Sequence, residues 1–316
     1  MNSLPKFARI SAAAGAVAWL LLLPTVTSDS RETEIIHKVV FFGMLVIVPL
    51  GLSLVPTENE RGFYRVAVLA QPVTAVPAIA SFFFPAGLFA ASLSSAWLIL
   101  SILIALFGLT RFKSRGLYPV AESSIDAGLL YLTVGPGWLV VYRLGIQPFD
   151  YGETIILLTV VHFHFAGFAA PIIAGLSGRV LAMRNYPRKM FGISVFAMVA
   201  AMPLVAAGIT FSPWLGFIGA LLISVGLLML AVLTFGWVLP AVTSLPGRVL
   251  LVIGALSTCV AMVLACLYAY SLATKILIID IPTMALTHGL LNAFGFVTCS
   301  LLAWTVITLH SRSKSL

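Results

Sequence analysis

Two short motifs place imidazole side chains inside long apolar runs. His162 and His164 lie two residues apart in the first motif, and His288 and Asn292 lie four apart in the second. Ionisable groups at membrane depth are costly, so they mark functional sites. Imidazole binds transition metals, ligates haem and relays protons near neutral pH. We therefore take all four residues as candidates for substrate binding or proton relay, and the three histidines also as candidate metal ligands.

The spacing within each motif limits what it can do. On a regular helix His162 and His164 point about 200° apart, so they cannot bind one metal ion together. They must serve two neighbours, or one of them packs against other helices. His288 and Asn292 share one helical stripe. His37 and Glu153, each near the start of an apolar run, are secondary candidates.

Three functions fit these residues. In the first, the histidine cluster binds a transition metal or haem for redox or membrane-enzyme chemistry. In the second, the same residues form the site of a secondary transporter for a small solute or a proton. In the third, the protein is structural or sensory and its histidines only hydrogen-bond helices together. The residues do not decide whether the protein is an enzyme, and its cofactor and oligomeric state stay unknown.

Composition excludes a soluble fold. The chain has 316 residues, of which 61% are hydrophobic and only 9% charged, whereas a soluble domain carries about 25% charged residues. The basic residues are scattered between apolar runs, which does not indicate a nucleic-acid partner. The lipid bilayer is the expected partner, and a small molecule or ion is the expected class of ligand. We expect an all-α bundle of membrane-spanning helices.

Hydropathy predicts about ten spans in a single integral membrane domain, residues 1–316, with no soluble domain. The weakest span is the third, because Gln71, Pro72 and Pro77 interrupt it and would allow a re-entrant segment instead. In the fifth, Gly135-Pro136-Gly137-Trp138 predicts a broken helix. No convincing internal repeat relates residues 1–142 to 153–316. The predicted spans are 8–28, 35–55, 65–84, 86–110, 121–142, 153–177, 190–211, 214–238, 248–271 and 283–309.

Basic residues orient the chain. With ten spans, only Arg31, Lys38, Arg143 and Lys275 fall on one side, and all other Lys and Arg residues fall on the other. Basic loops face the cytoplasm, so both termini are predicted to be cytoplasmic. A nine-span arrangement mixes the two sets. The expected location is the bacterial cytoplasmic (plasma) membrane.

The two histidine motifs also carry a resemblance. Val161 to Phe168 and Thr287 to Phe296, together with Val48-Pro49-Leu50-Gly51-Leu52 and the stretch from Gly135 to Arg143, resemble the YndJ-like family of bacterial multi-pass membrane proteins. The resemblance covers most of the chain and implies no established activity. The His-Phe-His motif is also similar to the haem-binding helix of haem-copper oxidases, in which opposed histidines ligate two haems. That likeness would imply at most a bis-histidine haem or a small metal site here.

Overall fold

The computed structural model describes residues 3–28, 30–55 and 62–313. Within them every regular element is helical, and ten helical segments are long and apolar enough to cross a membrane. The ten predicted spans are therefore confirmed in number and place. Their bounds are Ser3–Leu22, Arg31–Leu54, Phe63–Phe83, Leu88–Arg115, Val120–Leu144, Glu153–Leu181, Arg188–Phe211, Pro213–Ala241, Leu245–Thr274 and Ile281–Ser311.

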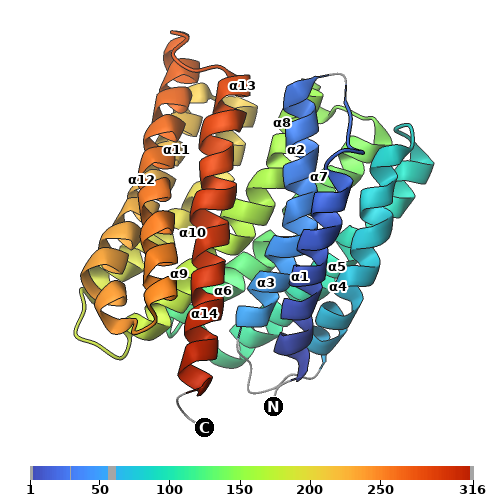
Figure 1. The fold of residues 1–316 in the computed structure, drawn as a ribbon. Coiled ribbons are helices and arrows are strands. Elements are labelled where there is room, and N and C mark those ends of the chain that lie inside the picture. The colour runs from blue at the N-terminus through green and yellow to red at the C-terminus, as the bar shows by residue number, and fades with distance from the viewer. Residues whose placement is uncertain (1–2, 29, 56–61, 314–316) are drawn as a thin grey trace. The chain divides into compact units, whose positions relative to one another are not determined.

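The chain divides into two compact units, which are described separately (Figure 1). Unit 1 comprises Met1–Leu117 and Ile125–Ile172, and unit 2 comprises Tyr118–Ser124 and Ile173–Leu316. The helices of unit 1 are α1 (Ser3–Leu22), α2 (Arg31–Phe42), α3 (Val48–Leu54), α4 (Phe63–Ala80), α5 (Leu88–Arg115), α7 (Val134–Leu144) and α8 (Glu153–His162). Those of unit 2 are α10 (Arg188–Phe211), α11 (Pro213–Leu233), α12 (Leu245–Thr274), α13 (Ile281–Met284) and α14 (Cys299–Ser313). Two helices, α6 (Val120–Tyr131) and α9 (Ala170–Leu181), contribute residues to both units.

In unit 1, two spans contain a wider π-helical stretch. The second span runs through η1 (Gly43–Ile47) between α2 and α3, and the sixth runs through η4 (Phe163–Ala169) between α8 and α9. A π-helical turn accommodates an extra residue and leaves backbone groups without their usual partner. Gln71 of α4 meets this need in the second span, because its side-chain amide donates to the Met44 carbonyl at 2.9 Å.

The third span is one continuous helix despite its prolines. Pro72 and Pro77 both lie inside α4. Gln71, which directly precedes Pro72, is buried. Its amide bond to the second span gives that polar side chain a partner at membrane depth. The third span, Phe63–Phe83, has the length of a full span, which favours it over the re-entrant segment.

The fifth span is broken, as predicted, but slightly earlier than the Gly-Pro-Gly sequence itself. Helix α6 ends at Tyr131 and α7 begins at Val134. Pro136 has no N–H to donate to the Leu132 carbonyl, which weakens the helix at that point, and proline is well suited to the first turn of the helix that follows. The interruption falls in the middle of the span.

In unit 2, small residues bring helices into close contact. A Cβ atom on Gly208 of α10 would lie 2.2 Å from the backbone of Gly216 in α11. Ser194 of α10 donates to the Gly226 carbonyl of α11 at 2.7 Å. Small residues and interhelical hydrogen bonds are how helices associate in a bilayer, where lipid is as apolar as the side chains. The π-helical segments of this unit are η5 (Thr234–Val238), η7 (Ala285–Gly289) and η8 (Leu291–Thr298).

Candidate functional site

His164 is fully buried and both of its ring nitrogens are hydrogen-bonded. Its Nδ1 lies 2.8 Å from the Val160 carbonyl, and its Nε2 lies 2.9 Å from Nε1 of Trp97. A carbonyl only accepts and an indole N–H only donates. The hydrogen-bond network therefore assigns the neutral Nδ1–H tautomer, with Nε2 as the acceptor. The two ring planes lie within 9° of parallel, with 6.2 Å between the ring centres.

Four spans of unit 1 meet at this imidazole. Trp97 comes from α5, and two glycines from the second and fifth spans pack on the histidine. A Cβ on Gly43 would lie 3.3 Å from His164 Cβ, and one on Gly135 would lie 3.1 Å from His164 Nδ1. Gly43 begins η1, and Gly135 follows the break in the fifth span. His164 thus lies where three interrupted helices contact one another.

His162 has a different environment. Its side chain is exposed, and its Nδ1 donates to the Leu158 carbonyl of its own helix at 2.6 Å. Within unit 1 the Nδ1 atoms of the two histidines therefore bond different carbonyls, those of Leu158 and Val160. The sequence allowed this division, since residues two apart point to different sides of a helix.

In unit 2, His288 and Asn292 contact each other. His288 Nδ1 lies 2.8 Å from the Ala261 carbonyl of α12, and the Asn292 side-chain nitrogen lies 3.2 Å from His288 Nε2. The same amide also donates to the His288 carbonyl at 3.0 Å. The shared stripe predicted for these two residues thus brings them together. The Ala261 carbonyl can only accept, so Nδ1 of His288 carries the hydrogen, and the Asn292 nitrogen lies at nearly equal distances from the two ring nitrogens, 3.3 Å from Nδ1 and 3.2 Å from Nε2.

The secondary candidate His37 lies in an aromatic and basic cluster of unit 1. Its Nε2 is 3.0 Å from the Tyr142 hydroxyl, and its ring meets Phe82 edge-on at 4.8 Å. The neighbouring Arg143 lies over the rings of both Phe82 and Tyr142. Glu153, the other secondary candidate, is exposed at the first turn of α8, close enough for its charge to act on Tyr142 and Arg143.

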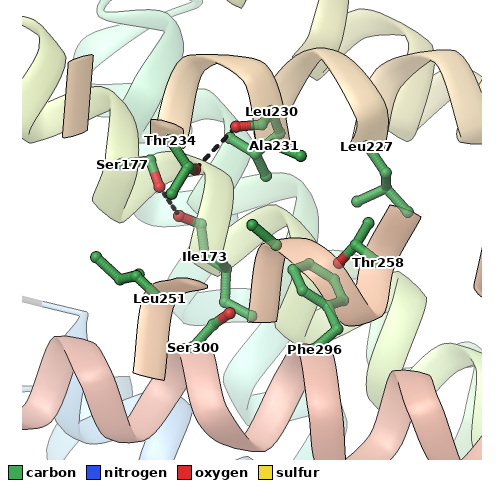
Figure 2. Close-up of a pocket in the computed structure, with 11 residues that line it drawn as sticks. Ile173, Ser177, Leu227, Leu230, Ala231, Thr234, Leu251, Thr258, Phe296 and Ser300 are labelled. Atoms are coloured by element: carbon green, nitrogen blue, oxygen red, sulfur yellow. Dashed lines mark hydrogen bonds between the residues drawn. The ribbon is translucent and has the colours of Figure 1, made fainter. Parts of the chain in front are cut away.

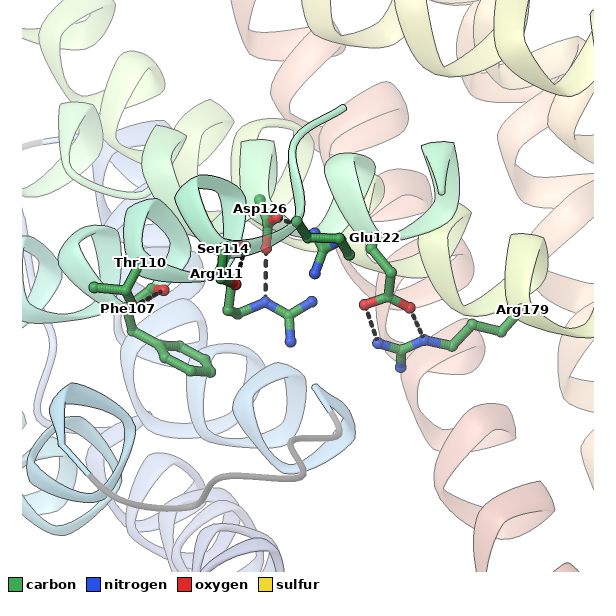
Figure 3. Close-up of polar contacts among 8 residues, drawn as sticks. Phe107, Thr110, Arg111, Ser114, Glu122, Asp126 and Arg179 are labelled. Carbon is green, nitrogen blue, oxygen red and sulfur yellow. Dashed lines mark hydrogen bonds and ion pairs between the residues drawn. The ribbon is translucent and has the colours of Figure 1, made fainter. Parts of the chain in front are cut away.

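Carboxylates near the start of the fifth span form ion pairs (Figure 3). In unit 1, Asp126 is only 2% exposed and contacts two guanidinium groups, Arg111 Nε at 2.6 Å and Arg115 Nη2. In unit 2, Arg179 binds Glu122 through Nε at 2.6 Å and Nη2 at 2.8 Å. A two-point Arg–carboxylate contact is among the stronger polar contacts in proteins. These ion pairs hold the helix ends in place, and both Asp126 and Glu122 are paired with arginine.

Unit 2 also contains a small cavity lined partly by hydroxyl groups (Figure 2). Its volume of about 20 Å³ can hold one water molecule. The hydroxyls of Ser177, Thr234 and Thr258 each donate to a carbonyl of their own helix, so their oxygens can only accept from a molecule in the cavity. Ser300 adds a fourth hydroxyl. The site suits one bound water and is too small for a solute in this conformation.

Among the described residues, no three His, Cys, Asp or Glu side chains gather as a metal site. Several residues that contact His164 and His37 were not predicted as site residues from the sequence. Trp97, Gly43 and Gly135 complete the His164 site, and Tyr142 and Arg143 complete the His37 cluster. One sequence feature could have marked Arg143 as a site residue: it is one of few basic residues on the side of the membrane predicted to face outside.

Ten apolar helical segments, a charged fraction far below that of soluble proteins and polar side chains bonded between spans define a multi-pass α-helical integral membrane protein. A family model described as YndJ-like protein matches residues 38–296, so the chain belongs to the YndJ-like family. The chain is 25% identical over 296 residues to the uncharacterized membrane protein YndJ of Bacillus subtilis (strain 168). That match covers 92% of this chain, which spans about half, 52%, of the relative. No solved structure matches the chain.

Proposed function

We propose that this protein is a proton-coupled secondary transporter in which His164 takes up the proton. The observation that carries the proposal is the bond between Trp97 and the Nε2 of His164 at a fully buried position. An ionisable group at membrane depth is a functional site by default. Here its protonation state is tied to one hydrogen bond between two spans.

Adding a proton would break that bond. Protonated imidazole carries a hydrogen on each nitrogen, so Nε2 and the Trp97 indole would be two donors facing each other at 2.9 Å. A charge without a partner in an apolar interior is also unfavourable. The protonated form therefore favours an arrangement in which Trp97 moves away or His164 reaches a more polar environment, and the neutral form favours the present one.

The helices around His164 are suited to such a change. The site touches η1, η4 and the beginning of α7, which are the interrupted parts of the second, sixth and fifth spans. Interrupted helices in transporters line binding sites and take part in alternating access, and π-helical stretches are frequent at functional sites. A two-state element next to a titratable group is what coupling between a proton and a solute requires.

The proposal has a direct spectroscopic test. In protein labelled with ¹⁵N-histidine and reconstituted in nanodiscs, we expect the His164 signals to change from the Nδ1–H form to the doubly protonated form as the pH is lowered from 8 to 4.5. The Trp97 indole N–H signal should shift with them. A His164 that stays neutral and bonded to Trp97 over this whole range would overturn the proposal and favour a packing role.

The functional test uses proteoliposomes that contain a pH-sensitive dye. Pools of small solutes added outside should trigger proton entry in the wild type, and His164→Gln should abolish it. His162→Gln is the matched control, because it removes the neighbouring imidazole on the exposed side and should leave proton entry unchanged. Equal proton entry in both variants would exclude His164 as the coupling group.

Metal or haem binding by His162, His164 and His288 stays a prediction. For His164 it requires that Nε2 leave Trp97, and for His288 that the Asn292 amide move away from the ring. An ultraviolet-visible spectrum with elemental analysis of the purified protein tests it. A Soret band or near-stoichiometric metal that is lost in the alanine variants would support a cofactor-bearing redox protein instead of a transporter.

A further inference from the structure

Arg143 is a buried guanidinium held in an aromatic box at one end of unit 1. It lies in the last turn of α7, is 6% exposed, and has its charged carbon 5.3 Å from the Phe82 ring centre and 5.4 Å from that of Tyr142. Nη2 donates to the Phe84 carbonyl at 2.6 Å. These contacts fix the orientation of the side chain without neutralising it.

The charge of Arg143 has no direct counter-charge. Among the described residues, the buried Asp126 pairs with two arginines, Glu122 pairs with Arg179 and Glu34 pairs with Lys38, but no carboxylate lies within ion-pair distance of Arg143. Its Nε–H is buried and has no acceptor. A buried charge and an unpartnered donor are both unfavourable unless another group satisfies them.

We infer that Arg143 is the centre of an anion-binding site that takes a carboxylate or phosphate group. Guanidinium presents N–H donors in a fork that matches both anions. The Tyr142 hydroxyl and His37, 3.0 Å apart, supply further polar atoms beside it, and Phe82 forms an apolar wall. Glu153 is the nearby carboxylate, but it is exposed and acts only at a distance.

The site lies one layer below an exposed surface. Phe84, Pro85 and Ala86 precede Gly87, whose backbone N–H donates to the Arg143 carbonyl at 2.8 Å, and all three are exposed. On the other side the exposed residues 145–147 follow α7. Gly145 and Ala86 are small and lie close together, with 3.2 Å between the Ala86 Cβ and a Cβ built on Gly145. By charge distribution this end faces outside.

The inference deepens the proposed function, and only the role of the anion as the transported solute rests on that function. If the protein is a proton-coupled transporter, a small anion bound at Arg143 is its solute, and a proton taken up at His164 would travel with it. Transport of one proton with one singly charged anion moves no net charge across the bilayer. Anion binding by itself does not depend on His164.

Thermal unfolding in a neutral detergent tests the binding. Sodium phosphate and sodium acetate are compared with sodium chloride at equal ionic strength, because a ligand that binds only the folded state raises the melting temperature. We expect at least one of the two anions to stabilise the wild type and to bind Arg143→Gln at least 10-fold more weakly. Arg184→Gln, which removes an exposed arginine, is the control and should behave as the wild type.

Two further variants keep the test decisive if Arg143→Gln does not fold. Arg143→Lys keeps the charge and loses the fork, and Tyr142→Phe keeps Arg143 and loses the hydroxyl, so both should weaken binding. The same comparison in nanodiscs with phosphatidylglycerol or phosphatidylcholine identifies a lipid phosphate as the source if only the anionic lipid stabilises the protein. Equal stabilisation of the wild type and all Arg143 and Tyr142 variants, or none by phosphate, acetate or anionic lipid, would overturn the inference.

The His164→Gln variant separates this inference from the proposed function. His164→Gln should bind the anion as tightly as the wild type does. Anion binding without any solute-dependent proton entry would refute the transporter and leave the site standing. Proton entry that is triggered by another class of solute and unaffected by Arg143→Lys would leave the transporter standing and refute the anion at Arg143 as its solute.

Discussion

Gly43 and His164 face each other where the second and sixth spans of unit 1 touch, and a Cβ on Gly43 would lie 3.3 Å from His164 Cβ. The two positions are also related in sequence. Residues 32–42 and 153–163 share six of eleven aligned residues, and continuing that alignment by one residue places Gly43 opposite His164. This short stretch of sequence likeness places a glycine in one span and the imidazole in the other.

The two glycines of the fifth span provide a matched pair of substitutions. A Cβ on Gly135 would lie 3.1 Å from both His164 Nδ1 and the Val160 carbonyl, whereas one on Gly137 would meet nothing within 4 Å. Gly135→Ala should cost about 1–3 kcal/mol through overpacking. Gly137→Ala should be neutral or stabilise by up to about 1 kcal/mol. Unfolding by rising SDS in mixed micelles measures both, and equal effects would mean that Gly135 has room to spare.

The ion pairs of Figure 3 should differ in their contribution to stability. Asp126→Asn leaves two guanidiniums without the carboxylate that they share, in a place where the acid is 2% exposed, so a loss of about 3–5 kcal/mol is expected. Glu122→Gln removes a partner that is 19% exposed, and its loss should be about 1–2 kcal/mol. The same SDS titration gives the two values. A smaller loss for Asp126→Asn than for Glu122→Gln contradicts the ranking.

The hydroxyl-lined cavity of unit 2 should hold one ordered water shared by its walls. Thr234→Val and Thr258→Val each remove one acceptor, and a shared water makes their destabilisations non-additive by about 0.5 kcal/mol or more. Thr305→Val is the control, since Thr305 makes the same kind of bond to its own helix at 2.9 Å but does not line the cavity. Strict additivity of the Thr234 and Thr258 variants would indicate an empty cavity.

Asp280 gives α13 a pH-dependent start. Its carboxylate accepts from the Thr283 N–H at 2.9 Å, and hydrogen bonding to Thr283 lowers the pKa of the Asp280 carboxyl. The cap is therefore fully formed above the unfolded-state pKa of about 3.9 and is lost as the pH falls through the lower folded value. Hydrogen exchange at 283–285 should speed up beyond its intrinsic pH dependence only below about pH 4. Asp280→Asn, which accepts a hydrogen bond without titrating, should show no such change.

Hydropathy and charge were enough to predict the ten spans and the break in the fifth, because both follow from local properties: apolar length, and a proline that cannot donate to Leu132. The partners of the polar residues were not predictable in the same way. Trp97 lies 67 residues from His164, and Tyr142 lies 105 residues from His37. Such pairs depend on how helices pack. The π-helical stretches escaped prediction for a related reason, since Gln71, which bonds the Met44 carbonyl, comes from another span.

The wide turns of the tenth span have a geometric consequence. η7 and η8 cover Ala285–Gly289 and Leu291–Thr298, so only Leu290 separates them. A π-helical turn can migrate along a helix by exchanging one carbonyl partner at a time. Each residue that it passes rotates by about 100° about the helix axis, the angle of one helical step, while both ends of the helix stay in place. Such migration past His288 and Asn292 would re-aim both side chains by more than a quarter turn without any hinge or rigid-body motion.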